Sequence, residues 1–147
     1  MLRGNHRARI DDKGRLKVPN GFRTVIESQW GAELFATSIT GEFVRLYPMS
    51  VWLDIERRLA AVPSTLPSKV RFLDRVNYFG QATTLDRQGR VLLPQLLRES
   101  AGMAGEVSVL GQHNHLAVWN QQRLEERLFK QQPFTDDDGK ALAEFGI

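Results

Sequence analysis

The alternation of apolar and polar residues divides the start of the chain into two short strands and a helix. Residues 5 to 10 alternate as an extended segment, and Leu16 and Val18 alternate with charged neighbours as far as Pro19. The Asp-Asp-Lys-Gly sequence between them, residues 11 to 14, has the composition of a tight turn. Proline suits the first position of a helix, and the apolar residues from Phe22 to Trp30 then recur at helical spacing.

The pattern continues with a hairpin and two helices. Residues 33 to 48 contain two apolar runs around Thr40-Gly41, which is typical of two strands joined by a short turn. Ser50 can cap a helix that carries one apolar face and ends at Pro63. A further helix is predicted from Ser68, with Val70, Leu73 and Val76 facing inward.

The same order of elements then occurs a second time. Residues 10 to 23 read IDDKGRLKVPNGFR, and residues 85 to 98 read LDRQGRVLLPQLLR. Five positions are identical, namely Asp11/Asp86, Gly14/Gly89, Arg15/Arg90, Pro19/Pro94 and Arg23/Arg98. Two such segments in register indicate a duplicated structural unit. Strands at 81–85 and 90–93, a helix at 94–101, a hairpin across 106–119 and a helix around Leu124 and Leu128 complete the second copy, so each half is predicted to run β-β-α-β-β-α.

Four segments follow from this duplication. Residues 1–63 form the first repeat, 64–78 a connecting helix, 79–131 the second repeat, and 132–147 an acidic tail expected to be loosely ordered and mobile. The chain of 147 residues has room for one domain of about 100 to 200 residues, or for two fused halves that share a core. The fold class is therefore predicted to be α+β.

Composition narrows the class of protein. The chain contains no cysteine, which excludes disulfides and thiolate zinc sites and is compatible with a reducing compartment. No run approaches the roughly 20 apolar residues of a membrane-spanning helix, and the first residues lack the apolar segment of a signal peptide. We expect a soluble, cytoplasmic protein with no membrane partner, no cofactor and no small-molecule substrate.

Charge is distributed unevenly along the chain. The net charge is only +3, but residues 1 to 25 carry seven Lys or Arg against two Asp, whereas residues 125 to 147 carry six acidic residues against three basic ones. A basic end of this kind favours a polyanionic partner, and the acidic end favours solvent.

The repeated turn places an aspartate four residues before an arginine. An Arg guanidinium held by a carboxylate becomes an oriented fork of donors that suits phosphates or guanine edges. The plainer alternative is that each pair only ties its turn down, because exposed ion pairs contribute about 0 to 1 kcal/mol. Copy one has Lys13 and Lys17 where copy two has Gln88 and Leu92, so copy one is the stronger DNA-binding candidate.

The candidate residues fall into two groups. The proposed DNA contacts are Arg3, Arg7, Lys13, Arg15, Lys17, Arg87 and Arg90, and the proposed structural turn residues are Asp11, Gly14, Asp86 and Gly89. Arg3, Arg7, Lys13 and Lys17 rest on charge and neighbourhood alone. Arg90 and Arg87 are accessory candidates.

These residues carry a resemblance to a known family. The doubled D-x-x-x-R turn followed by G-R-Φ-x-Φ-P (Φ, apolar), the opening L-R-G, and the strands E-V-S-V-L-G and L-A-V-W resemble the MraZ family of bacterial transcriptional regulators, over about residues 2 to 130. The resemblance implies that each repeat is half of an AbrB/MazE-like swapped-hairpin β-barrel, built by one chain with pseudo-twofold symmetry and flanked by helices. It also implies a cytoplasmic or nucleoid-associated protein that forms homo-oligomeric rings and binds short direct repeats in promoters of division and cell-wall gene clusters.

Three other readings remain. Related Asp turns from two halves superficially suggest the paired aspartates of an aspartic protease. However, neither copy has the D-T/S-G turn, and each Asp is followed four residues later by an arginine that favours the ionised carboxylate. No enzyme and no catalytic residue is therefore predicted. An antitoxin-like DNA-binding protein with a toxin partner is the non-enzymatic alternative. His113 and His115 have no evident third ligand, so no metal site is predicted, and Trp30, Trp52 and Trp119 are expected to pack in the core or an interface.

Overall fold

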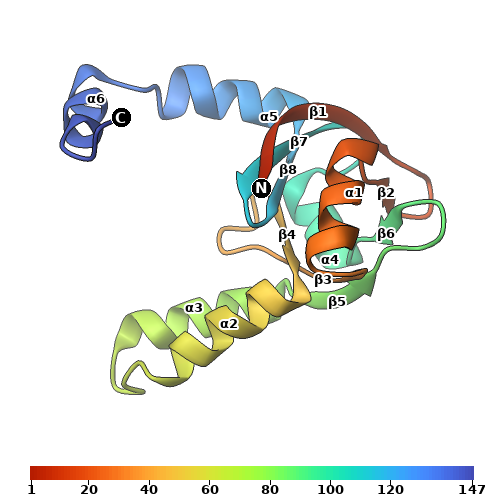
Figure 1. Ribbon diagram of the computed structural model, residues 1–147, viewed down its shortest axis with the longest axis horizontal. Helices are drawn as coiled ribbons and strands as arrows, with labels where there is room; N and C mark the ends of the chain where they lie inside the picture. The colour runs from red at the N-terminus through yellow and green to blue at the C-terminus, as the bar shows by residue number, and fades with distance from the viewer.

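A single antiparallel sheet of eight strands forms the body of the protein. The computed structural model describes all residues 1–147. The strands are β1 (Leu2–Ile10), β2 (Arg15–Lys17), β3 (Glu33–Thr37), β4 (Val44–Pro48), β5 (Gln81–Thr84), β6 (Arg90–Leu92), β7 (Gly105–His113) and β8 (Leu116–Asn120). They are ordered β5-β3-β4-β8-β7-β1-β2-β6, and the two end strands β5 and β6 lie next to each other. The sheet therefore curls into a nearly closed barrel (Figure 1).

The two repeats build this barrel by exchanging strands. The first strand of each repeat pairs with the third strand of the other, β1 with β7 and β5 with β3. Equivalent strands meet at the pseudo-twofold axis, where Leu16 lies opposite Val91 in β2–β6 and Arg45 lies opposite Ala117 in β4–β8. This is the α+β, pseudo-twofold swapped-hairpin barrel expected from the sequence.

Reciprocal backbone hydrogen bonds join the repeats beside the axis. The amide of Val18 donates to the carbonyl of Gly89 at 2.9 Å, and the amide of Leu93 donates to the carbonyl of Gly14 at 3.0 Å. A buried backbone amide without a hydrogen-bond partner lowers stability. Each repeat therefore depends on the other for the partner of the amide in the strand that follows its turn.

The apolar positions of the doubled sequence are the centre of the core. Ile10, Leu16, Val18 and Phe22 of the first copy and Leu85, Val91, Leu93 and Leu97 of the second are all buried. Burying a side chain of this size contributes about 1.5 to 3 kcal/mol. The pattern that identified the repeat is thus the pattern that holds its two copies together.

Helices surround the barrel in two ways. α1 (Asn20–Gln29) and α4 (Gln95–Ala101) begin directly after Pro19 and Pro94, and their inward residues join the core. α2 (Met49–Ala60) and α3 (Pro67–Tyr78) form an antiparallel pair that projects from the barrel (Figure 1). α5 (Gln121–Glu126) continues into the π-helical segment η1 (Arg127–Gln131), followed by α6 (Asp136–Ala143). None of these helices has the length and apolar character needed to cross a membrane.

The last segment is more ordered than the sequence suggested. Residues 132–147 were expected to be loosely ordered, but 136–143 form α6, so that expectation was wrong for these residues. The Thr135 side chain accepts from the Asp138 amide while the Asp138 carboxylate accepts from the Thr135 amide, which is a capping box. The acidic first turn further suits the positive end of the helix dipole. The expectation of loose order rested on the Asp-Asp-Asp-Gly stretch and did not take the cap at Thr135 into account.

Two aromatic stacks are related by the pseudo-twofold axis. Phe43 stacks on Trp119 with ring centroids 4.4 Å apart, and at the equivalent positions His115 stacks on Tyr47 at 4.7 Å. Trp52 and Trp119 are buried and Trp30 packs against the core, which confirms the packing role expected for the tryptophans. Desolvation, with help from nearby Arg45 and His113, lowers the pKa of His115 from 6.5 to about 4.

The depressed pKa of His115 predicts a loss of stability in mild acid. As the pH falls below about 6.5 the unfolded chain takes up a proton that the folded chain refuses until about pH 4, so the free energy of unfolding decreases across that window. Replacing the imidazole by the ring found at the equivalent position, His115→Phe, should flatten this part of the profile. Melting temperatures recorded from about pH 7 to 4.5 test it, with His113→Asn as the control that keeps most of the parent slope, because desolvation of His115 is the larger cause of the shift. An unchanged slope in His115→Phe would contradict the prediction.

Candidate nucleic-acid interface

The turn between β1 and β2 is built around the carboxylate of Asp11. One oxygen accepts the amides of Lys13 at 3.0 Å and Arg15 at 2.8 Å, and the other accepts Nε of Arg15 at 2.7 Å. The backbone closes the same turn, with the Gly14 amide donating to the Asp11 carbonyl at 3.0 Å. Only Nε of the Arg15 side chain is engaged, so both terminal nitrogens of the guanidinium lack a hydrogen-bond partner in the chain.

The turn between β5 and β6 repeats this geometry. Asp86 accepts the amides of Gln88 at 2.8 Å and Arg90 at 2.9 Å, and Nε of Arg90 at 3.1 Å. In both turns the bond from the arginine's backbone amide is the main cause that lowers the pKa of the aspartate. Because hydrogen bonds to an ionised carboxylate favour its charged form, each arginine is held by a carboxylate that is ionised at neutral pH.

The helix of each repeat reaches over the turn of the other. Arg23 of α1 lies against Gly89 and donates from a terminal nitrogen to the Arg87 carbonyl at 2.8 Å. At the equivalent position Arg98 of α4 lies with its guanidinium against Gly14. The identical pair Arg23/Arg98 in the sequence was the signal for this role, but the strand exchange that brings each arginine to the opposite turn could not be seen from a linear pattern.

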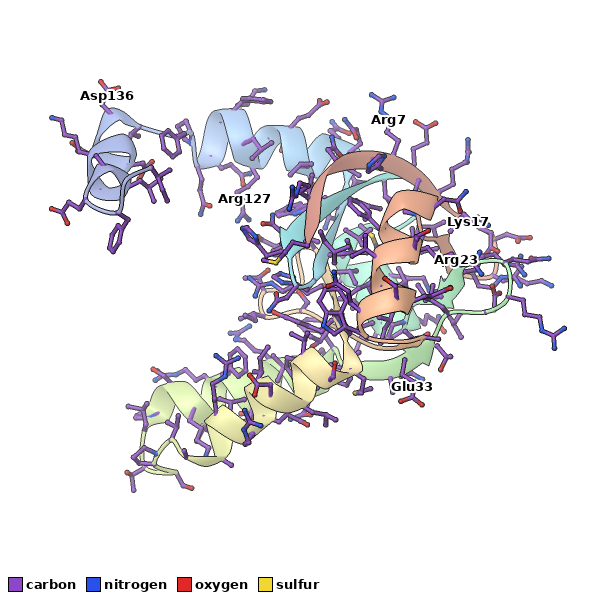
Figure 2. All side chains as sticks on the ribbon, in the orientation of Figure 1. Arg7, Lys17, Arg23, Glu33, Arg127 and Asp136 are labelled. Atoms are coloured by element: carbon purple, nitrogen blue, oxygen red, sulfur yellow. The ribbon has the colours of Figure 1, made fainter.

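The structure brings the candidate cations of the two turns onto one end of the barrel. Lys13 and Lys17 are exposed, and the ammonium of Lys17 donates to the Gln88 carbonyl, which ties the side chain of copy one to the turn of copy two. Arg15 and Arg90 are half-buried beside their aspartates, and Arg87 is exposed. Figure 2 shows Lys17 and Arg23 close together at this end.

The first strand, β1, places Arg7 and Arg9 beside Lys17 but holds Arg3 away from the turns. Arg7, Arg9 and Lys17 line a shallow groove of about 440 Å³ together with the Pro19-Asn20 start of α1. Arg7 points outward from β1 (Figure 2), and Arg9 lies 3.8 Å from Glu106. Arg3 is near the opposite end of β1, beside His6 and Phe22, and does not join the turn cluster. Arg9 was counted as a basic residue but missed as a candidate, although its spacing from Arg7 places both on one strand face.

The chemistry of the two aspartates is that of ion pairing. Each carboxylate is committed to amides and an arginine of its own turn, and its pKa is lowered. A dyad of aspartates sharing one proton requires the opposite shift in one partner. The geometry therefore gives no support to the aspartic-protease reading.

A duplicated swapped-hairpin barrel with a cationic pair of D-x-x-x-R turns at one end defines the class, an AbrB/MazE-like α+β protein. Comparison with known proteins then identifies the family. A family model described as MraZ protein, putative antitoxin-like, matches residues 1–75 and 79–144, and the chain belongs to the MraZ family.

Individual relatives agree over the full length. The chain is 47% identical to proteins named Transcriptional regulator MraZ from Acidobacterium capsulatum and from Koribacter versatilis, in each case over 100% of both chains. It is 36% identical to the protein of that name from Moorella thermoacetica, over 98% of this chain and 95% of the relative. These names describe regulators and not enzymes.

The glycine of the turn provides a test of the geometry. Gly14 has φ +83°, and a Cβ there would overlap the Arg98 guanidinium, so Gly14→Ala should destabilise the fold by about 1 to 3 kcal/mol. Gly89→Ala, at φ +77° and against Arg23, should behave in the same way. Gly21→Ala is the matched control, since it lies in α1 with open space around it and should be neutral or slightly stabilising. Urea denaturation measures all three, and equal stability of Gly14→Ala and Gly21→Ala would refute the interpretation.

Proposed function

We propose that the protein is a sequence-specific DNA-binding transcription regulator that contacts double-stranded promoter DNA through the turn from Asp11 to Lys17. The observation that carries this proposal is the state of Arg15. Its Nε is fixed by Asp11, while both terminal nitrogens are free to bind an external acceptor. The names of the relatives support regulation of transcription as the role.

The local chemistry fits a duplex better than a small anion. A guanidinium presents donors in a plane that matches guanine O6 and N7 or a phosphate, and holding it in advance reduces the entropy lost on binding. Lys13 and Lys17 are exposed cations of the same segment, and Arg7 lines a groove with Lys17. All three fit phosphate contacts, which position a protein on DNA without reading sequence. The cations extend across the end of the barrel, as a stretch of DNA backbone requires.

Copy two fits an accessory role. Arg90 has the same relation to Asp86 as Arg15 to Asp11, and Arg87 is exposed beside it, but Gln88 and Leu92 replace the two lysines of copy one. Arg3 is assigned only a peripheral backbone contact, because it lies away from the turns. On this proposal copy one reads the site and copy two contributes general attraction.

The remaining parts of the proposal come from the family resemblance. They are a cytoplasmic, nucleoid-associated protein, a closed homo-oligomeric ring, and short direct repeats in the promoter of a division and cell-wall gene cluster as the target. A head-to-tail interface can close into a ring. Such a ring presents the same turn at regular intervals, so contacts to repeated sites strengthen one another through effective concentration.

An antitoxin with a toxin partner is the second candidate. The description of the matching family model, putative antitoxin-like, favours it. Co-purification of a small partner protein that is unaffected by substitution of Arg15 would support this candidate over the first.

Arginine substitution in the two turns tests the DNA contact. Arg15→Ala should weaken binding to the selected promoter site about 10- to 100-fold, which corresponds to ~1 to 3 kcal/mol, while Arg90→Ala has a smaller effect. Sites are first selected from random DNA with the parent protein, and gel shifts with each variant then measure affinity. Oligomer mass and melting temperature must remain those of the parent. Undiminished binding by Arg15→Ala would overturn the assignment.

Exchanging the residues at the equivalent positions 13 and 88 tests independently which copy contacts phosphate. Lys13→Gln gives copy one the residue of copy two, and Gln88→Lys does the reverse. If copy one contacts phosphate and copy two does not, Lys13→Gln should reduce the magnitude of the slope of log affinity against log salt by about 1, and Gln88→Lys should leave it nearly unchanged. The opposite result would place the contact on copy two.

A further inference from the structure

The helices that follow the two hairpins are equivalent in sequence order but not in packing. In the first repeat α2 follows Pro48 and is succeeded by α3; in the second, α5 and η1 follow Asn120, the position equivalent to Pro48, and are succeeded by α6. α3 turns back along α2, whereas α6 stands away from the barrel beyond the end of η1 (Figure 1). The second repeat therefore lacks the helix that covers the first.

In the first repeat α3 seals an aromatic cluster. Val76 of α3 is 1% exposed and packs with Tyr47 and Trp52, and Phe72 lies against the same cluster. The Thr37 hydroxyl donates to the Val76 carbonyl at 2.7 Å, which fixes the helix to β3. Apolar side chains and a buried hydrogen bond together hold α3 in place.

In the second repeat the equivalent cluster remains open. Trp119 and Leu124 occupy the positions of Tyr47 and Trp52, and Ala117, Phe43 and Leu110 complete the cluster, but no second helix contributes to it. A groove of about 470 Å³ runs along this site instead, with Leu128 at its edge 46% exposed. Exposed apolar surface of this kind marks an interaction site, and here it lies where the first repeat has a helix.

α6 and its flanks carry unburied apolar side chains. Phe134, Phe145 and Ile147 are 72%, 78% and 81% exposed. Phe145 follows the N-cap residue Thr135 by the same number of positions as Val76 follows Leu66, but Val76 lies within α3 whereas Phe145 lies just beyond the end of α6. The segment from Phe134 to Ile147, here called the arm, thus has the side chains that the groove lacks.

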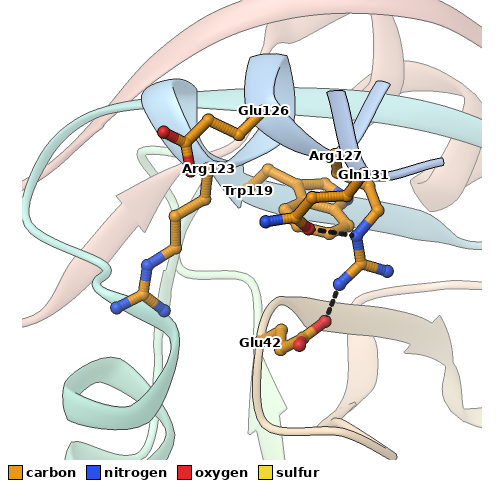
Figure 3. A pocket seen from close by; sticks show the side chains of 6 residues that line it. All are labelled: Glu42, Trp119, Arg123, Glu126, Arg127 and Gln131. Carbon is orange, nitrogen blue, oxygen red and sulfur yellow. Dashed lines mark hydrogen bonds and ion pairs between the residues drawn. The ribbon is translucent and has the colours of Figure 1, made fainter. Parts of the chain in front are cut away.

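Charge complements this fit. Arg127 and Arg45 line the groove, and no carboxylate does. Arg127 is paired with Glu42 and bonded to Gln131 across the face of Trp119 (Figure 3). Arg45 donates to the Tyr47 hydroxyl at 3.2 Å and lies over the Phe43 ring, and it has no carboxylate partner. The arm carries Asp136, Asp137, Asp138 and Glu144 against Lys140. An acidic arm therefore matches a groove that holds an arginine without a carboxylate.

We propose that the arm of one copy docks in the groove of the next copy, where α6 takes the place that α3 takes in the first repeat. η1 prolongs α5, and α6 stands away from the barrel (Figure 1). No residue of the arm lines the groove of its own chain. The interface is heterologous, so each copy gives an arm and receives one, which is the arrangement that closes into a ring or extends as a chain. This inference deepens the oligomer of the proposed function, but its test does not involve DNA.

A complementation experiment tests whether the contact is between copies. The arm variant Phe134→Ser/Phe145→Ser and the groove variant Leu128→Asp alter exposed residues, so both should fold, and each alone should be monomeric by light scattering. Mixed, they retain one intact interface, since the groove of the first accepts the arm of the second, and they should form a heterodimer and nothing larger. Leu53→Asp, an equally exposed change on α2, is the control that should keep the parent mass. Parent mass in both variants would overturn the proposal.

Cross-linking distinguishes a neighbour's groove from the chain's own. The chain has no cysteine, so Phe145→Cys/Leu128→Cys introduces the only pair. Under oxidation it should give covalent dimers and higher species on a denaturing gel. A cross-linked monomer would show that the arm folds back on its own chain and would refute the exchange. Arg15→Ala should leave the cross-linking unchanged, so loss of DNA binding and loss of assembly can be separated.

Discussion

The structure depends on the antiparallel contact between β2 and β6, where each repeat completes the other. Val18 and Leu93 donate their amides to carbonyls in the opposite turn, and Leu16 and Val91 meet in the core between them. Neither half can satisfy these groups alone, because the partner strand belongs to the other copy. This junction fixes the position of each turn against the other repeat, while Asp11 and Asp86 orient Arg15 and Arg90 within the turns.

The sequence predicted the parts of the fold that repeat. Apolar spacing gave the strands and helices of both copies, and the duplicated IDDKGRLKVP-like segment gave the turns and the core positions. Strand exchange between the copies could be expected only from the family resemblance, because periodicity shows which residues face a core but not which strand lies alongside. The crossing of Arg23 and Arg98 to the opposite turns was missed for the same reason.

The sequence named most of the basic residues of the candidate site but not how they are arranged in space. Lys13, Arg15 and Lys17 were found by charge, and the structure adds Arg7 and Arg9 beside Lys17 while separating Arg3. Arg3 lies near the start of the nine-residue strand β1, whereas the turn follows the end of that strand. Counting the basic residues at the start of the chain does not show this separation. The helix α6 was missed because the Asp-Asp-Asp-Gly stretch suggested loose order and the cap at Thr135 was not recognised.

Fusion of the two halves into one chain has a consequence for direction. A dimer of identical half-barrels has a true twofold axis and presents the same face whichever way it is turned, which suits an inverted site. Here the halves share a backbone path but differ at Lys13/Gln88 and Lys17/Leu92, so the end of the barrel that bears the turns has a polarity. A unit whose two halves differ binds the duplex in one direction only. Repeated along DNA, such a unit fits a site made of direct repeats and not a palindrome.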